Sequence, residues 1–83
     1  VKLRFSGVPA RIARETEWHR SQVTVPEPGG TTTVTLDVPI TAELVNFILG
    51  WGGDVEVLAP PSLRERIAKT AERVLSIYRK ERK

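Results

Sequence analysis

The chain contains neither cysteine nor methionine. Without cysteine, neither a disulfide framework nor a thiolate metal site can form, which suits the cytosol. The sequence also lacks an apolar run near the ~20 residues that a membrane-spanning helix needs, and it lacks the layout of a signal peptide. Because no initiator methionine is present, we expect the chain to be a fragment of a longer protein, located in the cytoplasm.

The side chains that catalysis uses are scarce. His19 is the one histidine in the sequence, and the serine and acidic residues near it do not form a plausible catalytic arrangement. One histidine and scattered carboxylates do not form a metal-ligand set. The glycines at positions 50, 52 and 53 follow an expected helix and precede an expected strand, the reverse of a phosphate-binding loop. We expect no enzyme, no cofactor and no metal. A small enzyme stays an alternative. Catalytic turnover that disappears in the His19→Ala variant would support it.

What is present indicates one ordinary globular domain over residues 1–83. Apolar residues make up 40% of the chain and charged residues 28%, which is not the composition of a disordered segment. The net charge is +3, but 13 basic residues stand against 10 acidic ones, so charge alone does not indicate a DNA-binding module. The basic residues that crowd the C-terminus are Arg79, Lys80, Arg82 and Lys83. We interpret them as a solvated helix end.

The first 25 residues predict a strand, a helix and a second strand. Alternation over residues 1–5 is typical of a half-buried strand. Its inward side chains are Val1, Leu3 and Phe5. Residues 8–16 predict a short amphipathic helix. Its apolar side chains are Val8, Ile12 and Ala13. Residues 22–25 predict the second strand.

A third strand is predicted over residues 31–40, where the alternation is clearest. Its apolar face consists of Val34, Leu36, Val38 and Ile40. Residues 26–30 are rich in proline and glycine and predict a loop. The second and third strands are therefore expected to form a hairpin with a longer connection.

The second half of the chain predicts a helix, a strand and a final helix. Thr41 can cap the first of these helices. Its apolar stripe consists of Leu44, Phe47, Ile48 and Trp51. Residues 54–57 alternate as a strand does, and two prolines end it. Ser62 and Glu65 have the spacing of a capping box at the start of a helix of about four turns. The apolar stripe of this last helix consists of Leu63, Ile67, Ala71, Val74, Leu75 and Tyr78.

This order predicts an α+β protein, a ferredoxin-like βαββαβ sandwich with an added C-terminal helix and two helices on one face of an antiparallel sheet. The other face is expected to be open and polar. Its side chains would be Lys2, Arg4, Gln22, Thr24, Thr33, Thr35, Asp37 and Glu56. An RNA-recognition module is disfavoured because that face offers no aromatic side chain on which a base can stack. The stripe of the last helix is expected to pack mainly in the domain's own core, with a sheet edge or a second chain as alternatives.

Two stretches of the sequence resemble a known family. Residues 48–67 read ILGWGGDVEVLAPPSLRERI and precede a helix that ends at Tyr78, and residues 17–22 read EWHRSQ. In this order they resemble the C-terminal extension, or WCX-type domain, that follows the WYL domain in bacterial transcriptional regulators. That family has a Leu-Gly-aromatic-Gly turn, a Val-x-Val-Leu strand and a Leu-Arg-Glu-Arg helix start after a Trp-x-x-Ser-Gln segment. The resemblance touches nearly the whole chain.

The resemblance implies a regulatory role. Regulators of this type carry an N-terminal winged helix-turn-helix domain for operator DNA and a WYL domain that senses a ligand, in some members nucleic-acid fragments. The extension contributes to dimerisation and effector response. We therefore expect an accessory, non-catalytic domain whose partners are a second copy, in a homodimer, and the WYL and helix-turn-helix domains of the same chain. Operator DNA would be bound through the helix-turn-helix domain, which these 83 residues do not contain.

Two sets of side chains are candidates for binding. The interface candidates are Trp18, Trp51, Leu63, Ile67, Val74 and Tyr78. The candidates for an anionic effector such as single-stranded nucleic acid are Lys2, Arg4, Arg11, Arg14 and Arg20. Each set also has an ordinary interpretation. The interface candidates can be core residues, and the basic candidates can be cations that face the solvent. Binding that depends strongly on salt, and is lost when Arg11→Ala is combined with Arg14→Ala, would favour the anion site over self-association.

Overall fold

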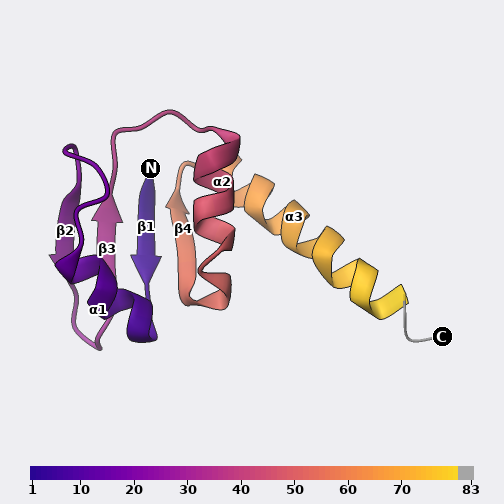
Figure 1. Cartoon of the computed structure of the whole chain (residues 1–83), viewed down its shortest axis with the longest axis horizontal. Coiled ribbons are helices and arrows are strands. Elements are labelled where there is room, and N and C mark those ends of the chain that lie inside the picture. The colour runs from indigo at the N-terminus through magenta and orange to yellow at the C-terminus, as the bar shows by residue number, and fades with distance from the viewer. Residues whose placement is uncertain (81–83) are drawn as a thin grey trace.

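In residues 1–80, the part of the chain that the computed structural model describes, four strands form one antiparallel sheet in the order β2-β3-β1-β4 (Figure 1). Along the chain the elements are β1 (Lys2–Phe5), α1 (Gly7–Glu15), β2 (Val23–Pro26), β3 (Thr32–Thr35), α2 (Ala42–Leu49), the short 3₁₀ helix η1 (Gly52–Asp54), β4 (Val55–Ala59) and α3 (Pro61–Lys80). The chain is therefore an α+β protein, as its sequence predicted.

The hydrophobic core lies between one face of the sheet and helices α1 and α2. Leu3 and Phe5 of the central strand β1 are fully buried. Leu3 pairs with Val34 on one side and Val57 on the other, so these three side chains share a face. The helices add Ala10, Ala13, Val45 and Ile48 to the same cluster. Alternation in β1 therefore predicted the buried side of this strand correctly.

Helix α1 buries a different side from the one predicted. Ala10 and Ala13 are buried, whereas Val8 is 74% exposed and Ile12 is 37% exposed. Small alanine side chains let the helix backbone approach the sheet closely, and the two larger side chains lie at the surface. Of the three predicted apolar side chains, only Ala13 faces the core, and the predictions for Val8 and Ile12 are wrong.

Strand β2 has the opposite orientation from the prediction. Val23 pairs with Thr35 and Val25 with Thr33, so the two valines point to the open face, where they are 57% and 45% exposed. The cause lies in Gln22, whose Nε2 donates to the carbonyl oxygen of Thr16 at 2.8 Å and to Thr24 Oγ1 at 2.9 Å. These bonds hold Gln22 and Thr24 on the helix side.

Strand β3 is shorter than predicted and ends at Thr35. Leu36 still exchanges two backbone hydrogen bonds with Val1, at 2.8 and 2.9 Å. The N–H of Asp37 then donates to Ser21 Oγ at 2.9 Å. Residues 38–40 have no strand beside them in the described part of the chain, and Ile40 is 40% exposed. The apolar alternation therefore extends beyond the strand, which ends where no neighbouring strand among the described residues is left to pair with it.

Helix α2 begins as predicted, because Thr41 Oγ1 accepts a hydrogen bond from the N–H of Leu44 at 3.2 Å. The glycine turn after it needs one positive φ, 64° at Gly52, and Gly50 keeps a helical φ of −63°. Such a positive φ is disfavoured for residues with a Cβ. The spacing of glycines in the sequence suggested positive φ at Gly50, Gly52 and Gly53, and of these three only Gly52 adopts it.

Helix α3 begins earlier than a capping box would place it. The carbonyl oxygen of Pro60 accepts hydrogen bonds from the N–H groups of Leu63 and Arg64, both at 3.1 Å. Ser62 therefore lies inside the first turn, and the predicted capping box is not formed. Pro61 is the first helical residue, where its missing N–H costs no hydrogen bond. The helix continues to Lys80; of the predicted basic end, Arg82 and Lys83 lie outside the described residues.

Candidate functional site

Helix α3 leaves the body of the domain after its first two turns. Leu63 is fully buried and Ile67 packs partly against the core. From Ala71 to Lys80 every residue is exposed, and the helix projects away from the sheet (Figure 1). The prediction that this helix packs mainly in the domain's own core is therefore wrong for its second half.

The projecting half of α3 keeps an apolar side, which we call the distal stripe. It consists of Ala71, Val74, Leu75, Ile77 and Tyr78, and the last four are 48%, 49%, 55% and 66% exposed. Spacings of three and four residues place these side chains on one side of a helix. The opposite side is charged and consists of Glu65, Arg66, Lys69, Glu72, Arg73, Arg79 and Lys80. Contiguous exposed apolar side chains of this kind mark interaction surfaces.

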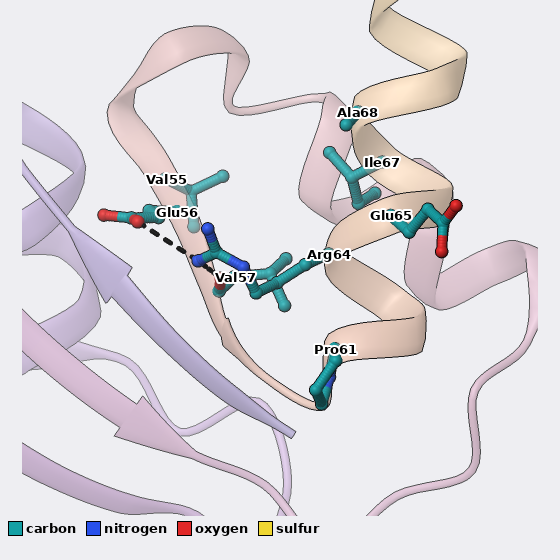
Figure 2. Close-up of a pocket in the computed structure, with 8 residues that line it drawn as sticks. All are labelled: Val55, Glu56, Val57, Pro61, Arg64, Glu65, Ile67 and Ala68. Carbon is teal, nitrogen blue, oxygen red and sulfur yellow. Dashed lines mark hydrogen bonds and ion pairs between the residues drawn. The ribbon is translucent and has the colours of Figure 1, made fainter.

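A groove lies between β4 and the first turns of α3, with a volume of about 450 Å³ (Figure 2). We call it the β4–α3 groove. Its lining consists of Val55, Glu56, Val57, Pro61, Arg64, Glu65, Ile67 and Ala68. Figure 2 shows Arg64 reaching from the helix toward the strand, while Glu65 points away from β4. Ala68 continues into the distal stripe through Ala71 and Leu75, because these three residues follow one another at spacings of three and four.

Arg64 connects the two walls of the groove. Its Nη1 donates to the backbone carbonyl oxygen of Val57 at 2.7 Å and to Glu56 Oε2 at 3.2 Å. Glu56 Oε1 in turn accepts from Arg4 Nη1 at 3.4 Å. The three charged side chains are about half exposed, so each ion pair contributes little to stability by itself. Their arrangement fixes where the base of α3 sits relative to β4.

The predicted anion site is divided by the sheet. Lys2 and Arg4 alternate with the buried residues of β1 and so lie on the open face, where Arg4 is paired with Glu56. Arg14 lies on the helix side, because its Nη1 donates to Thr32 Oγ1 at 3.1 Å. Arg11 is on α1 with it, one turn earlier, and Arg20 follows in the loop before β2. The structure therefore does not gather the five cations into one site.

The surroundings of Arg14 are also mixed in charge. The hollow beside it is lined by Glu15, Thr16, Glu17, Gln22 and Thr24. Two carboxylates in the lining oppose the approach of an anion, since like charges at short range repel.

The two tryptophans proposed for an interface lie in one aromatic cluster with Phe5 and Phe47. Trp18 stacks on Phe5 with ring centroids 5.5 Å apart, and it meets Phe47 edge-on at 5.3 Å. Trp51 completes the cluster at 5.7 Å from Phe5 and 5.9 Å from Trp18. Both tryptophans are partly buried against the core. This geometry suits a packing role, since aromatic pairs at such distances stabilise the fold.

The remaining interface candidates are divided along α3. Leu63 is buried inside the domain, Ile67 lines the groove, and Val74 and Tyr78 lie in the distal stripe. Sequence reasoning did not single out Ile77, which lies three residues after Val74, or the groove residues Arg64 and Ala68. A complete helical projection of residues 61–80 contains the signal for Ile77. The groove depends on how α3 leaves β4, and no local pattern reports that angle.

Within residues 1–80, no helix combines the length and the apolar character needed to cross a membrane. No three side chains of His, Cys, Asp or Glu gather as metal ligands in the same residues. A family model described as the WCX domain matches residues 1–75. This range includes all four strands described above, helices α1 and α2, and α3 as far as Leu75. No curated protein matches the chain.

Proposed function

Because the chain belongs to the WCX domain family, as its sequence resemblance predicted, we propose that it is an accessory, non-catalytic domain that assembles a WYL-type bacterial transcriptional regulator and takes part in its effector response. The family places it in the context of WYL-domain regulators. Its proposed partners are a second copy of itself and the WYL and helix-turn-helix domains of the same protein. In this proposal operator DNA is bound by the helix-turn-helix domain, and the regulator works in the cytoplasm.

The observation that carries the assembly role is the distal stripe. Four large apolar side chains are about half to two-thirds exposed on a helix that has left its own core. Burying such a side chain contributes about 1.5–3 kcal/mol when burial is complete. A partner that covers the distal stripe therefore gains far more than one that covers the charged side of the same helix.

A ferredoxin-like assignment is part of the same proposal. Its support is the element order β1-α1-β2-β3-α2-β4 together with the strand order β2-β3-β1-β4. In this description α3 is an addition to the sandwich, joined at the edge strand β4. An addition that projects from the edge leaves the sandwich intact and is free to serve as an attachment to another molecule.

Direct binding of an anionic effector is the alternative, and it has weaker support. The candidate cations lie on both sides of the sheet, and Arg4 and Arg14 already have partners at 3.4 and 3.1 Å. Lys2, Arg11 and Arg20 remain for such a role, but Lys2 lies on the open face of the sheet and Arg11 lies on α1. Single-stranded nucleic acid is therefore the added ligand in the experiment that follows.

Light scattering over a concentration series tests the proposal on the 83-residue chain. We expect wild type to self-associate, and the double variant Val74→Ser/Leu75→Ser to remain monomeric. The matched control is Glu72→Ser/Arg73→Ser on the charged side of the same turn of α3, which should associate like wild type. A wild type that stays monomeric at all concentrations contradicts the assembly role. A mass that rises only with short single-stranded DNA at low salt supports the alternative instead.

A further inference from the structure

We propose that two copies of this chain pair through their distal stripes with the α3 helices antiparallel, and that Tyr78 of each copy enters the β4–α3 groove of the other. This inference rests on the proposed assembly role and specifies its geometry. It follows from three features of α3: the distribution of side-chain sizes along its apolar side, the length of its exposed half, and the position of the groove.

Side-chain size changes along the apolar side of α3. Beyond the half-buried Ile67, the apolar side first carries the small residues Ala68, Thr70 and Ala71, and toward the end it carries the large residues Val74, Leu75, Ile77 and Tyr78. In a parallel pair, large side chains would meet large ones and alanines would meet alanines, which leaves crowding at one end and voids at the other. An antiparallel pair places large side chains against small ones, which close packing favours. The helix therefore complements itself only when one copy is reversed.

A reversed pair has a natural register. With the twofold axis level with the midpoint between Glu72 and Arg73, Val74 of one copy lies beside Ala71 of the other, and Leu75 lies near Ala68. Ile77 lies near Thr70, on the same flank of the interface. In this register Tyr78 lies level with Ile67, at the mouth of the groove. From Ile67 to Tyr78 the helix rises about 16 Å, at about 1.5 Å per residue.

The exposed part of α3 is too short to hold two copies by itself. A stable interface buries on the order of 800 Å² from each partner, and a helix face about 16 Å long and about 10 Å wide offers much less than that. The groove supplies the additional contact, because it adjoins the distal stripe through Ala68 and has a volume of about 450 Å³. A second copy is the occupant that the molecule itself provides, since every copy carries both the protruding side chain and the groove.

Tyr78 fits the chemistry of the groove. It is the most exposed of the large apolar side chains of α3, at 66%. The groove has apolar walls from Val55, Ile67 and Ala68, and polar groups from Glu56 and Arg64. A phenol ring packs against the walls while its hydroxyl reaches a charged group, which is how tyrosine acts at interfaces. Because both copies exchange the same contact, the pairing is closed and stops at a dimer.

Disulfide mapping tests the orientation of the helices, and the absence of native cysteine makes the result unambiguous. Thr70→Cys and Ile77→Cys should form a mixed disulfide when the two proteins are combined under oxidising conditions. Ile77→Cys alone should not cross-link, since the two copies of residue 77 would lie about 13 Å apart along the axis, beyond the ~7 Å limit for a disulfide. Lys69→Cys on the charged side is the matched control and should stay unlinked. A homodimer of Ile77→Cys with no mixed disulfide overturns the antiparallel arrangement, while the proposed assembly role stands.

A rescue experiment tests the groove. Tyr78→Ala removes the inserted ring and Ala68→Phe fills the groove. Each variant alone should therefore self-associate with a dissociation constant at least about tenfold higher than that of wild type. A mixture of the two variants should regain affinity. In the mixed dimer, Tyr78 of the Ala68→Phe copy enters the unaltered groove of the Tyr78→Ala copy, and the filled groove faces the copy that lacks the ring. If the wild type dimerises and the mixture shows no gain, Tyr78 does not occupy the groove. If wild type is monomeric in light scattering, both this inference and the assembly role are overturned together.

Discussion

Arg64 of α3 donates a hydrogen bond of 2.7 Å to the backbone carbonyl oxygen of Val57 in β4. Because β4 is an edge strand of the sheet described for residues 1–80, this carbonyl has no neighbouring strand on that side there. Open strand edges invite pairing with other chains, and proteins commonly cover them with a helix or a charge. Here one side chain does both, since it belongs to the covering helix and brings a guanidinium to the edge. The start of α3 is thus fixed to the sheet, and its apolar end is directed outward.

Replacing Arg64 with methionine tests this attachment. Arg64→Met keeps an unbranched apolar stem and removes the guanidinium. We expect the free energy of unfolding to fall by about 1–2 kcal/mol, which is below the ~1.5–3 kcal/mol of a fully shielded hydrogen bond with a charged group, because the Arg64 side chain is half exposed. Urea denaturation measures the change. Arg66→Met, on the charged side of the same helix, is the control and should unfold like wild type. Equal losses in the two variants would mean that the bond to Val57 contributes nothing.

The two predicted helix caps give a second, paired test. Thr41 forms its cap and Ser62 does not, because Ser62 lies inside the first turn of α3. Thr41→Ala should therefore destabilise the fold by about 1 kcal/mol, whereas Ser62→Ala should be neutral or slightly stabilising, since alanine is the better helix former. Thermal unfolding of both variants measures the difference. A loss in Ser62→Ala as large as that in Thr41→Ala would show that the capping box forms in solution.

Local patterns predicted the elements well where one kind of interaction decides the outcome. The strand at Lys2–Phe5 and the helix cap at Thr41 follow from alternation and from capping chemistry, and both are confirmed. Strand β2 differs because two requirements compete there. Hydropathy alone would turn Val23 and Val25 inward, but Gln22 bonds to the backbone of the preceding loop and holds the opposite orientation. The hydropathy pattern of a four-residue strand does not show that the backbone of the preceding loop needs a hydrogen-bond partner.

The candidate site was predictable only in part, for a related reason. The apolar side of the last helix is evident from spacing, and Val74 and Tyr78 were expected there. Which portion the domain covers depends on where α3 leaves β4, and this follows from the contacts of Leu63 and Arg64. Spacing also gave no reason to separate Arg4 from Arg14, yet the sheet places them on opposite faces. Patterns report which residues share a face of one element, and packing decides which elements meet.

Trp18 distinguishes a packing role from an interface role. Because its ring contacts Phe5, Phe47 and Trp51 within 6 Å between centroids, Trp18→Ala should lower the free energy of unfolding by about 2–4 kcal/mol. Tyr78→Ala is the counterpart, and it should leave unfolding nearly unchanged while weakening self-association. Chemical denaturation at low protein concentration, combined with light scattering, separates the two effects. A Trp18→Ala variant that unfolds like wild type but no longer associates would make Trp18 an interface residue.

Neighbouring threonines in β3 provide the last test, because they differ in what their hydroxyl groups do. Thr32 is fully buried; its Oγ1 donates to the carbonyl oxygen of Ala10 at 3.1 Å and accepts from Arg14. Thr33 is also buried, at 6% exposure, but it lies on the opposite side of the strand. Valine has the shape of threonine without the hydroxyl, so Thr32→Val should cost about 1–2 kcal/mol of unfolding free energy. Thr33→Val should be neutral or stabilising, since valine suits strands and no hydrogen bond of its side chain is present within residues 1–80. Urea denaturation of the two variants compares them at equal volume. A larger loss in Thr33→Val would mean that β3 turns its other face to α1, and the whole register of the sheet would then have to change with it.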